Sequence, residues 1–218
     1  KSFYAKLLAI LRVSNNKGGS TPGVDNTVWT NGKEKLEAAQ KLQSRGYRSK
    51  PLRRIYIPKK NGKKRPLSIP AMSDRAMQTL HKIALEPMAE TLADKNSYGF
   101  RPRRSCNDAV AACFQLLCRK TSPQWIFEAD IKACFDNIRH EWILKNIPIN
   151  KTILNQWLKA GYIEEKRLFP TDKGTPQGGT ISPMIMNMVL DGLETQINKK
   201  FPRWKNKKVN FIRYADDF

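Results

Sequence analysis

The sequence has 218 residues, enough for one large domain or two small ones with a real hydrophobic core. Its 40 Lys and Arg residues face 19 Asp and Glu residues, giving a formal net charge of +21, and its 40% hydrophobic content excludes wholesale disorder. This charge is typical of proteins that neutralise phosphates or, less often, of proteins that lie on anionic lipid. Because the sequence shows neither a basic amphipathic helix nor a lipidation signal, nucleic acid is the favoured partner and a membrane is not expected.

The cysteines point to a reducing environment. The sequence has four cysteines and two histidines, with no CxxC pair and no histidine at zinc-ligand spacing from a cysteine. This pattern predicts free thiols in a reducing cytoplasm, of a bacterium or an organelle, rather than a zinc site. The first residue is Lys1 rather than Met, so we expect the sequence to be part of a longer protein.

The N-terminal region begins with two predicted helices. The segment KSFYAKLLAILRV has the spacing of an amphipathic helix, and a turn-rich loop follows at residues 15–25. A second helix is expected from about Lys33 and should end at Gly46, because glycine suits a helix C-cap. The residues expected to face inward on the first helix are Phe3, Leu7, Leu8 and Leu11.

A strongly basic segment comes next. From Arg45 to Pro66 there are ten Lys and Arg residues and no acidic residue. Within it, RRIYIP and RPLSIP have alternating apolar character, and Asn61 and Gly62 between them form a strong signal for a hairpin turn. The segment therefore predicts a basic β-hairpin. Its tip carries Lys59, Lys60, Lys63, Lys64 and Arg65.

The rest of the chain mixes helices, loops and short strands. Ser73 is expected to cap a long helix, and Ser105 with Asp108 three residues later predicts a capping box at the start of another. The turn KGTPQGGTISP is rich in glycine and leads into a helix. Because the elements follow no strict βαβ order, the pattern predicts an α+β fold. Further helices are expected at residues 139–146, 151–161 and 184 to about 199.

Two strand-like segments each end in aspartate. QWIFEADI, residues 124–131, carries Asp130, and VNFIRYADD, residues 209–217, ends on Asp216 and Asp217. Side by side in an antiparallel sheet, these ends would gather three carboxylates, whose hard oxygens suit Mg²⁺. Two such ions about 3.5–4 Å apart are a standard device for phosphoryl displacement. An ordinary surface turn is the alternative for the Asp pair; the β-type flanks and the positive charge elsewhere favour the metal site.

Three motifs resemble those of reverse transcriptases in both order and spacing. They are YADDF at residues 214–218, ADIKACFDNI at residues 129–138 and GTPQGGTISP at residues 174–183. The segments TPGVD, RRIYIPKKNGKKRPLSIP and SYGFRP are similar to the group II intron maturase branch of that family. The resemblance covers almost the whole chain, and the motifs together are far more specific than any one alone.

The resemblance implies the fingers and palm of a right-hand polymerase, with an antiparallel palm sheet, packed helices and a basic fingers β-hairpin. Residues 1–120 correspond to the fingers and residues 121–218 to part of the palm, and the thumb and maturase segments of the family are expected to be absent. It further implies two Mg²⁺ ions, for which Mn²⁺ can substitute. Their expected ligands are Asp130, Ile131, Asp216 and Asp217.

The resemblance also assigns residues to substrate contacts. Lys59 and Arg65 are similar to the pair that grips the triphosphate, and Phe135 to the aromatic gate that excludes a ribose 2′-hydroxyl. From the residues alone, Lys59 could equally be a solvated charge and Phe135 ordinary core. Gln177 is expected to contact the nucleotide, although it could be a plain turn residue. The residues expected to contact nucleic acid are Arg101, Gly178 and Tyr214.

Two functions remain open. One is an RNA-directed DNA polymerase that uses an RNA template, a DNA primer and dNTPs. The other is a maturase-type module that binds intron RNA through its basic fingers and has no polymerase activity in this form. Only the first requires the three aspartates, while the second depends on the basic segments. A homodimer is expected at high concentration.

Overall fold

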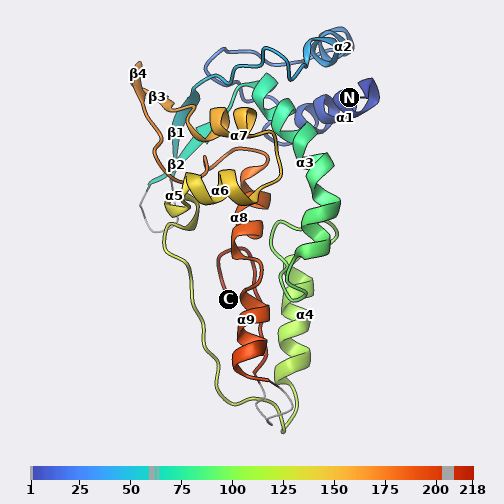
Figure 1. Cartoon of the computed structure of the whole chain (residues 1–218), viewed down its shortest axis with the longest axis vertical. Helices are drawn as coiled ribbons and strands as arrows, with labels where there is room; N and C mark the ends of the chain where they lie inside the picture. The colour runs from blue at the N-terminus through green and yellow to red at the C-terminus, as the bar shows by residue number, and fades with distance from the viewer. Residues whose placement is uncertain (1, 59–61, 63, 203–208) are drawn as a thin grey trace. The chain divides into compact units, whose positions relative to one another are not determined.

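The computed structural model describes residues 2–58, 62, 64–202 and 209–218, and its architecture is α+β, as the sequence predicts (Figure 1). The chain forms two compact units. The first unit comprises Lys1–Glu86 and Phe135–Ser182, and the second comprises Pro87–Cys134 and Pro183–Phe218. Each unit is thus assembled from two separate stretches of sequence, whereas the predicted fingers and palm are divided at residue 120.

A four-stranded mixed sheet lies in the first unit, with strand order β2-β1-β3-β4. The basic segment forms the predicted hairpin: β1 and β2 pair antiparallel, with Arg54 opposite Ser68. A second hairpin, β3 and β4, was not predicted, and β3 runs parallel to β1. Both partners in that hairpin are only three residues long, too short to show an alternating pattern. The strands are β1 Leu52–Pro58, β2 Lys64–Ile69, β3 Tyr162–Glu164 and β4 Arg167–Phe169.

Helices supply the rest of the first unit. Buried side chains such as Ile10, Met77, Ile143 and Leu154 form its core. The helices are α1 Phe3–Ser14, α2 Gly32–Lys41, α6 His140–Asn146, α7 Lys151–Leu158 and the larger part of α3 Met72–Leu92.

The second unit is mostly helical. Its helix α4 begins with the predicted capping box, because the Ser105 side chain accepts from the N–H of Asp108 while the Asp108 carboxylate accepts from the N–H of Ser105. The helix predicted from Met184 is divided in two at Gly192, whose φ of +98° breaks the helical path. Within the described residues no helix is long and apolar enough to cross a membrane. The elements here are α4 Cys106–Leu117, α8 Ser182–Leu190 and α9 Leu193–Lys200, and α5 Cys134–Asn137 begins at the unit boundary.

The first helix buries a different face from the predicted one. Ala9, Ile10 and Val13 are buried, whereas Phe3, Leu8 and Leu11 are 40%, 41% and 37% exposed and Leu7 is half-buried. The prediction of an inward Phe3–Leu11 face is therefore wrong. Because α1 carries large apolar side chains around most of its circumference, periodicity alone does not select the face that packs.

The second helix ends earlier than predicted, and the third begins earlier. Helix α2 stops at Lys41 because Leu42 leaves the helical region and its side chain is buried, so tertiary packing ends the helix. Gly46 has the expected positive φ, +71°, but lies in a separate turn. Helix α3 starts at Met72, so Ser73 lies in its first turn rather than at its cap.

The two strands predicted to carry the aspartates appear only as isolated bridges. Asp130 pairs with Asp217, and Arg213 pairs with Ser97. Beside the Asp130–Asp217 bridge, Ala129 and Phe218 exchange two backbone hydrogen bonds, and residues 124–128 are not in a strand. The pairing is thus shorter than the predicted strands.

Candidate active site

The adjacent aspartates lie on a tight turn in the second unit. The N–H of Tyr214 donates to the carbonyl of Asp217 at 2.8 Å, and the N–H of Asp217 donates to the carbonyl of Tyr214 at 3.1 Å. Ala215, at the first corner, has a φ of +60°. Because a residue with a side chain rarely adopts this conformation, the turn needs support from its surroundings.

The segment that carries Asp130 runs antiparallel beside this turn. Ala129 and Phe218 exchange two backbone hydrogen bonds of 2.8 and 2.9 Å, and the N–H of Ile131 donates to the carbonyl of Asp216 at 3.2 Å. Asp130 therefore lies opposite Asp217 in the pairing. The fold thus brings the three aspartates onto neighbouring backbone positions.

Negative charge accumulates at this place. Partial burial raises the pKa of Asp217, and the carboxylates of Asp216 and Asp130 raise it further. Burial, followed by the charge of Asp216, raises the pKa of the Cys134 thiol to about 11. The nearby carboxylates make it unfavourable for Asp217 to lose its proton, and a bound cation would remove this repulsion. The oxygen-only donor set and its negative charge therefore fit a divalent metal ion.

In the described residues, the side chains do not form a complete set of metal ligands. Within the part of the chain that the structure describes, no group of three or more His, Cys, Asp or Glu side chains is arranged to hold a metal ion. Asp130 and Asp217 are exposed and Asp216 is half-buried, so their rotamers are open to adjustment. The metal-ligand roles of these residues, and of Ile131, remain a proposal.

A second cluster of predicted residues forms in the first unit. The side-chain amide of Gln177 donates to both carboxylate oxygens of Asp136 at 3.2 Å and accepts from Nε of Arg65 at 3.2 Å. The N–H of Thr175 also donates to the carbonyl of Phe135 at 2.7 Å. The fold thus joins the predicted nucleotide contacts Arg65, Phe135 and Gln177 through one loop.

That loop is shaped by close backbone approaches. Gly178 has a φ of +123°, and a Cβ there would lie 2.5 Å from the carbonyl oxygen of Ser68. The N–H of Ser68 donates to the carbonyl of Gln177 at 2.7 Å, so β2 and the loop touch directly. Buried His140 uses its Nε2–H to donate to the carbonyl of Gly174 at 2.8 Å, since a carbonyl can only accept.

The other predicted contacts have different surroundings. Lys59 lies outside the described residues. Arg101 is buried, and its guanidinium donates to the Glu90 carboxylate and to the carbonyls of Asp94 and Ser97. Tyr214 is 38% exposed. The nucleic-acid contacts proposed for Arg101, Gly178 and Tyr214 stay predictions.

Sequence reasoning missed two supporting residues. Asp136 follows Phe135 directly and orients the Gln177 amide, but an exposed Asp on a short helix gives no sequence signal. Arg213 is fully buried beside the aspartate turn. Phe211, Arg213 and Ala215 are buried and alternate with more exposed neighbours, but the sequence gives no sign of this, because the outward residues Ile212 and Tyr214 are apolar as well.

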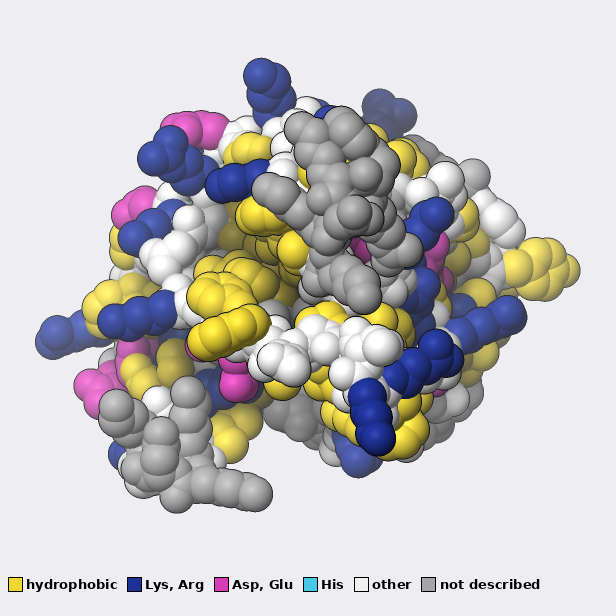
Figure 2. Space-filling model, turned by 90° about the horizontal axis from the view of Figure 1, so that it is seen from below, with side chains coloured by type: hydrophobic (Ala, Val, Ile, Leu, Met, Phe, Trp, Pro, Cys, Tyr) yellow, Lys and Arg dark blue, Asp and Glu magenta, His cyan; other side chains and the backbone are white. Residues whose placement is uncertain are grey.

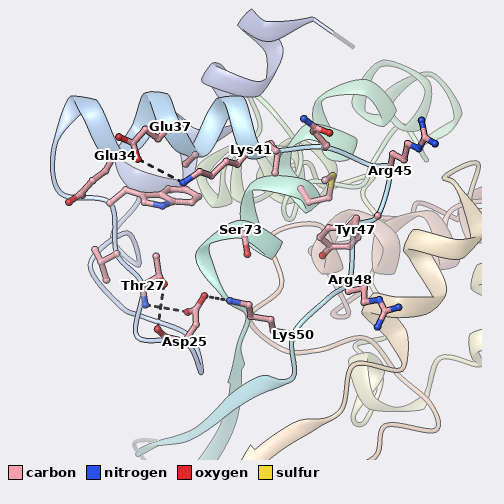
Figure 3. A pocket seen from close by; sticks show the side chains of 17 residues that line it. Asp25, Thr27, Glu34, Glu37, Lys41, Arg45, Tyr47, Arg48, Lys50 and Ser73 are labelled. Atoms are coloured by element: carbon pink, nitrogen blue, oxygen red, sulfur yellow. Dashed lines mark hydrogen bonds and ion pairs between the residues drawn. The ribbon is translucent and has the colours of Figure 1, made fainter.

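A separate cavity of about 680 Å³ lies in the first unit, and none of the predicted site residues lines it. Figure 3 shows Glu34 and Glu37 on α2, and Arg45 and Arg48 on the segment that follows it. Lys50 closes one side through an ion pair with Asp25, 2.9 Å between Nζ and Oδ2. The mixture of charges gives this cavity no evident single ligand class.

The gathered aspartates, the glycine-shaped loop and the excess of positive charge indicate the class of nucleic-acid polymerases. Comparison with known proteins makes this specific. Residues 57–218 match the family described as reverse transcriptase (RNA-dependent DNA polymerase), and residues 1–42 match the N-terminal domain of reverse transcriptase. The chain belongs to the reverse transcriptase family.

The relatives support the group II intron branch. The group II intron-encoded protein LtrA of Lactococcus lactis subsp. cremoris is 38% identical over 214 residues, covering 93% of this chain and 35% of the relative. Protein YkfC of Escherichia coli strain K12 is 33% identical over 242 residues, covering 93% of this chain and 64% of the relative. An uncharacterized 91 kDa protein in the cob intron of Schizosaccharomyces pombe is 38% identical over 161 residues, covering 71% of this chain and 20% of the relative. The chain therefore spans less than two thirds of each relative, and the resemblance to group II intron reverse transcriptases is confirmed.

Proposed function

We propose that this chain supplies the fingers, residues 1–120, and part of the palm, residues 121–218, of an RNA-directed DNA polymerase of the group II intron type. The reaction adds deoxynucleotides from dNTPs to the 3′-hydroxyl of a DNA primer on an RNA template. The observation that carries the proposal is the pairing of Asp130 opposite Asp217, beside Asp216, in a chain of net charge +21. A basic protein with one acidic focus suits metal-dependent chemistry on a polyanion.

In this proposal Asp130, Asp216 and Asp217 hold two Mg²⁺ ions, or Mn²⁺ in their place, together with the carbonyl of Ile131. Bound there, the ions would stabilise the attacking and leaving oxygens of an in-line displacement. Among the described residues, the Ile131 carbonyl accepts from the N–H of Cys134 at 3.2 Å, and the second lone pair of a carbonyl oxygen can take a ligand. The paired backbone fixes the backbone positions of the three aspartates, and the exposure of their side chains leaves the carboxylates accessible to a ligand.

The first unit supplies the proposed nucleotide contacts. The Nε of Arg65 donates to Gln177, and the other N–H groups of its guanidinium suit the oxygens of a triphosphate. Lys59 would add a point charge to the same phosphates. The amide of Gln177 is held by hydrogen bonds at both its nitrogen and its oxygen, so its side chain loses little conformational entropy when a nucleotide binds. Phe135 would exclude the ribose 2′-hydroxyl, while Arg101, Gly178 and Tyr214 are proposed to contact nucleic acid.

The test of the metal assignment is Asp216→Asn. In a protein that also carries the thumb, primer extension on an RNA template with Mg²⁺ should disappear, because the neutral amide lacks the negative charge of the carboxylate, while RNA affinity should be unchanged or slightly raised. Mn²⁺ binding, followed by electron paramagnetic resonance, gives a readout that does not depend on turnover. Extension by the variant at the wild-type rate would show that Asp216 holds no catalytic ion.

A second function is favoured by a different observation. The acid-free run from Arg45 to Pro66 comprises the exposed Arg45 and Arg48 and most of the basic β1–β2 hairpin, and this positive segment suits the phosphates of an intron RNA. LtrA is described as a group II intron-encoded protein, so we propose that this chain also binds intron RNA for splicing and mobility. Replacing Arg45 and Arg48 by glutamine should weaken RNA binding, whereas the aspartate variants should not. Equal RNA affinity in both sets of variants would exclude a fingers-based RNA site.

A further inference from the structure

Arg213 forms the centre of a buried network under the aspartate turn. Its side chain is completely buried, and its Nη1 donates to Oδ1 of Asn187 at 3.1 Å and to the carbonyl of Ala215 at 3.2 Å. Its Nη2 donates to Oδ1 of Asp191 at 2.5 Å and lies 4.0 Å from Oδ2 of Asp94. The Arg213 guanidinium thus contacts the side chain of Asn187, the carboxylates of Asp191 and Asp94, and the backbone of the turn.

The backbone of Gly99 also contacts Ala215. A Cβ on Gly99 would lie 2.4 Å from the backbone nitrogen of Ala215, so the two backbones are in direct contact. Asn187 closes the arrangement, because its Nδ2 donates to the carbonyl of Gly99 at 2.8 Å while its Oδ1 accepts from Arg213. The strained corner at Ala215, with φ of +60°, is therefore contacted both by the Gly99 backbone and by the Arg213 guanidinium.

Stability alone does not explain a charge in this position. Burial lowers the pKa of Arg213 and raises that of Asp191, which shows that both groups lose hydration here. Buried ion pairs of this kind are often no more stabilising than apolar residues of similar size. What an apolar residue cannot do is donate to the Ala215 carbonyl, and this bond fixes the peptide that leads into Asp216.

We infer that Arg213 is a positioning residue for the aspartate pair: through the Ala215 carbonyl it sets the direction in which the carboxylates of Asp216 and Asp217 leave the turn. The inference rests on the proposed role of these aspartates as metal ligands. Arg213 itself touches neither the metal nor the nucleotide. It acts as the outer support that orients metal ligands, and losing such a support typically costs about 10- to 100-fold in metal affinity.

The decisive variant is Arg213→Lys, which keeps the positive charge between Asp94 and Asp191 but loses the fork. A single ammonium has no planar pair of donors that could satisfy Asp191 and the Ala215 carbonyl together. We expect Mn²⁺ affinity, measured by electron paramagnetic resonance titration of the 218-residue chain, to fall about 10- to 100-fold. We also expect the amides of Tyr214 and Asp217, which bond across the turn, to exchange with solvent at least about tenfold faster without metal, the population change that about 1.4 kcal/mol of lost support produces.

Arg75→Lys is the matched control. Arg75 is also a buried arginine that donates to backbone carbonyls, those of Gly18 and Thr21, but it lies in the first unit. It should lower the melting temperature without changing Mn²⁺ affinity or exchange at the turn. If Arg213→Lys fails to fold, Arg213→Met combined with Asp191→Asn is measured in its place: it removes the Asp191 charge, while Asp94 keeps the N–H donors of Gly192 and Glu194.

The outcomes separate the inference from the function on which it rests. Asp216→Asn must abolish Mn²⁺ binding if the metal assignment is right, and unaltered binding would overturn that assignment alone. Weakened binding together with faster exchange in Arg213→Lys supports the positioning role. Wild-type exchange of Tyr214 and Asp217 in Arg213→Lys overturns it, whether or not the chain binds Mn²⁺.

Discussion

The orientation of the Gln177 side chain is set by two other side chains. An isolated glutamine can present either end of its amide to a ligand, but here Asp136 accepts from its nitrogen and Arg65 donates to its oxygen. The amide orientation is therefore fixed by contacts within the chain itself. Neither partner could be deduced from the sequence, because residues 65, 136 and 177 come together only through the fold.

Phe135 carries the first prediction. If its ring closes the floor of the nucleotide site, a ribose 2′-hydroxyl must clash with it or displace it, at about 1–3 kcal/mol. Leaving that hydroxyl without a partner adds about 1–3 kcal/mol. Phe135→Val should therefore improve ribonucleotide incorporation by orders of magnitude, since about 1.4 kcal/mol is tenfold, and lower deoxynucleotide use only modestly. Single-nucleotide incorporation with dNTP and rNTP measures the ratio, and an unchanged ratio would leave Phe135 as a core residue.

At the scale of elements, strong local signals were predicted correctly and weak ones were not. The β1–β2 hairpin and the Ser105–Asp108 capping box follow from residues adjacent in sequence, and both form as predicted. The end of α2 at Lys41 depends on burial of Leu42, which local sequence does not encode. The aspartates were predicted to meet and do lie on paired backbone, but Arg213, which supports them, contacts residues from two distant segments, Asp94 in one and Asn187 and Asp191 in the other.

The contact between β2 and the glycine-rich loop carries the second prediction. Gly178→Ala would force a side chain into a φ of +123° and place its Cβ 2.5 Å from the Ser68 carbonyl. The loop must then move away and lose the hydrogen bond from Ser68 to Gln177. We expect a loss of at least about 1–3 kcal/mol in unfolding free energy, measured by urea denaturation. Gly32→Ala is the control, because no atom beyond its chain neighbours and its own helix lies within 4 Å of the added Cβ and no loss is expected. Equal effects of the two substitutions would contradict a tight approach.

The capping box of α4 carries a prediction about pH. The Ser105 hydroxyl donates to the Asp108 carboxylate at 2.7 Å and the Ser105 N–H at 2.6 Å, and these bonds hold the pKa of Asp108 below its ordinary value. Because the folded pKa is the lower one, the cap's contribution is complete above the unfolded pKa of about 3.9 and is lost as pH falls through the folded pKa. An NMR titration should therefore find the Asp108 midpoint below about 3.9. In Ser105→Ala the midpoint should rise towards that value, and a midpoint that does not move would show that the hydroxyl is not responsible.

At the scale of the whole molecule, exposed apolar side chains predict self-association. In the second unit Trp125 is 94%, Phe127 81% and Phe114 70% exposed, and Figure 2 shows hydrophobic side chains at the surface among Lys and Arg. Surfaces of this kind favour a dimer at high concentration. Sedimentation velocity should show a dimer fraction that rises with concentration and falls when Trp125 and Phe127 are replaced by serine. A monomer at all concentrations would refute the prediction.

The net charge of +21 carries the last prediction, because it determines how RNA binding must respond to salt. Each phosphate neutralised by a Lys or Arg releases condensed counterions, so log K should fall linearly with log salt by about 0.7 per contact for single-stranded RNA and about 0.9 for B-form duplexes. Arg45→Gln and Arg48→Gln together should reduce the slope by about 1.4 if both side chains lie on phosphates of a single strand. Asp130→Asn should leave the slope unchanged, since the acidic focus binds no phosphate directly. Filter binding between low and physiological salt gives both slopes. If affinity were independent of salt, the interface would have to be built from base stacking, and the exposed aromatic side chains rather than the basic segment from Arg45 to Pro66 would be its source.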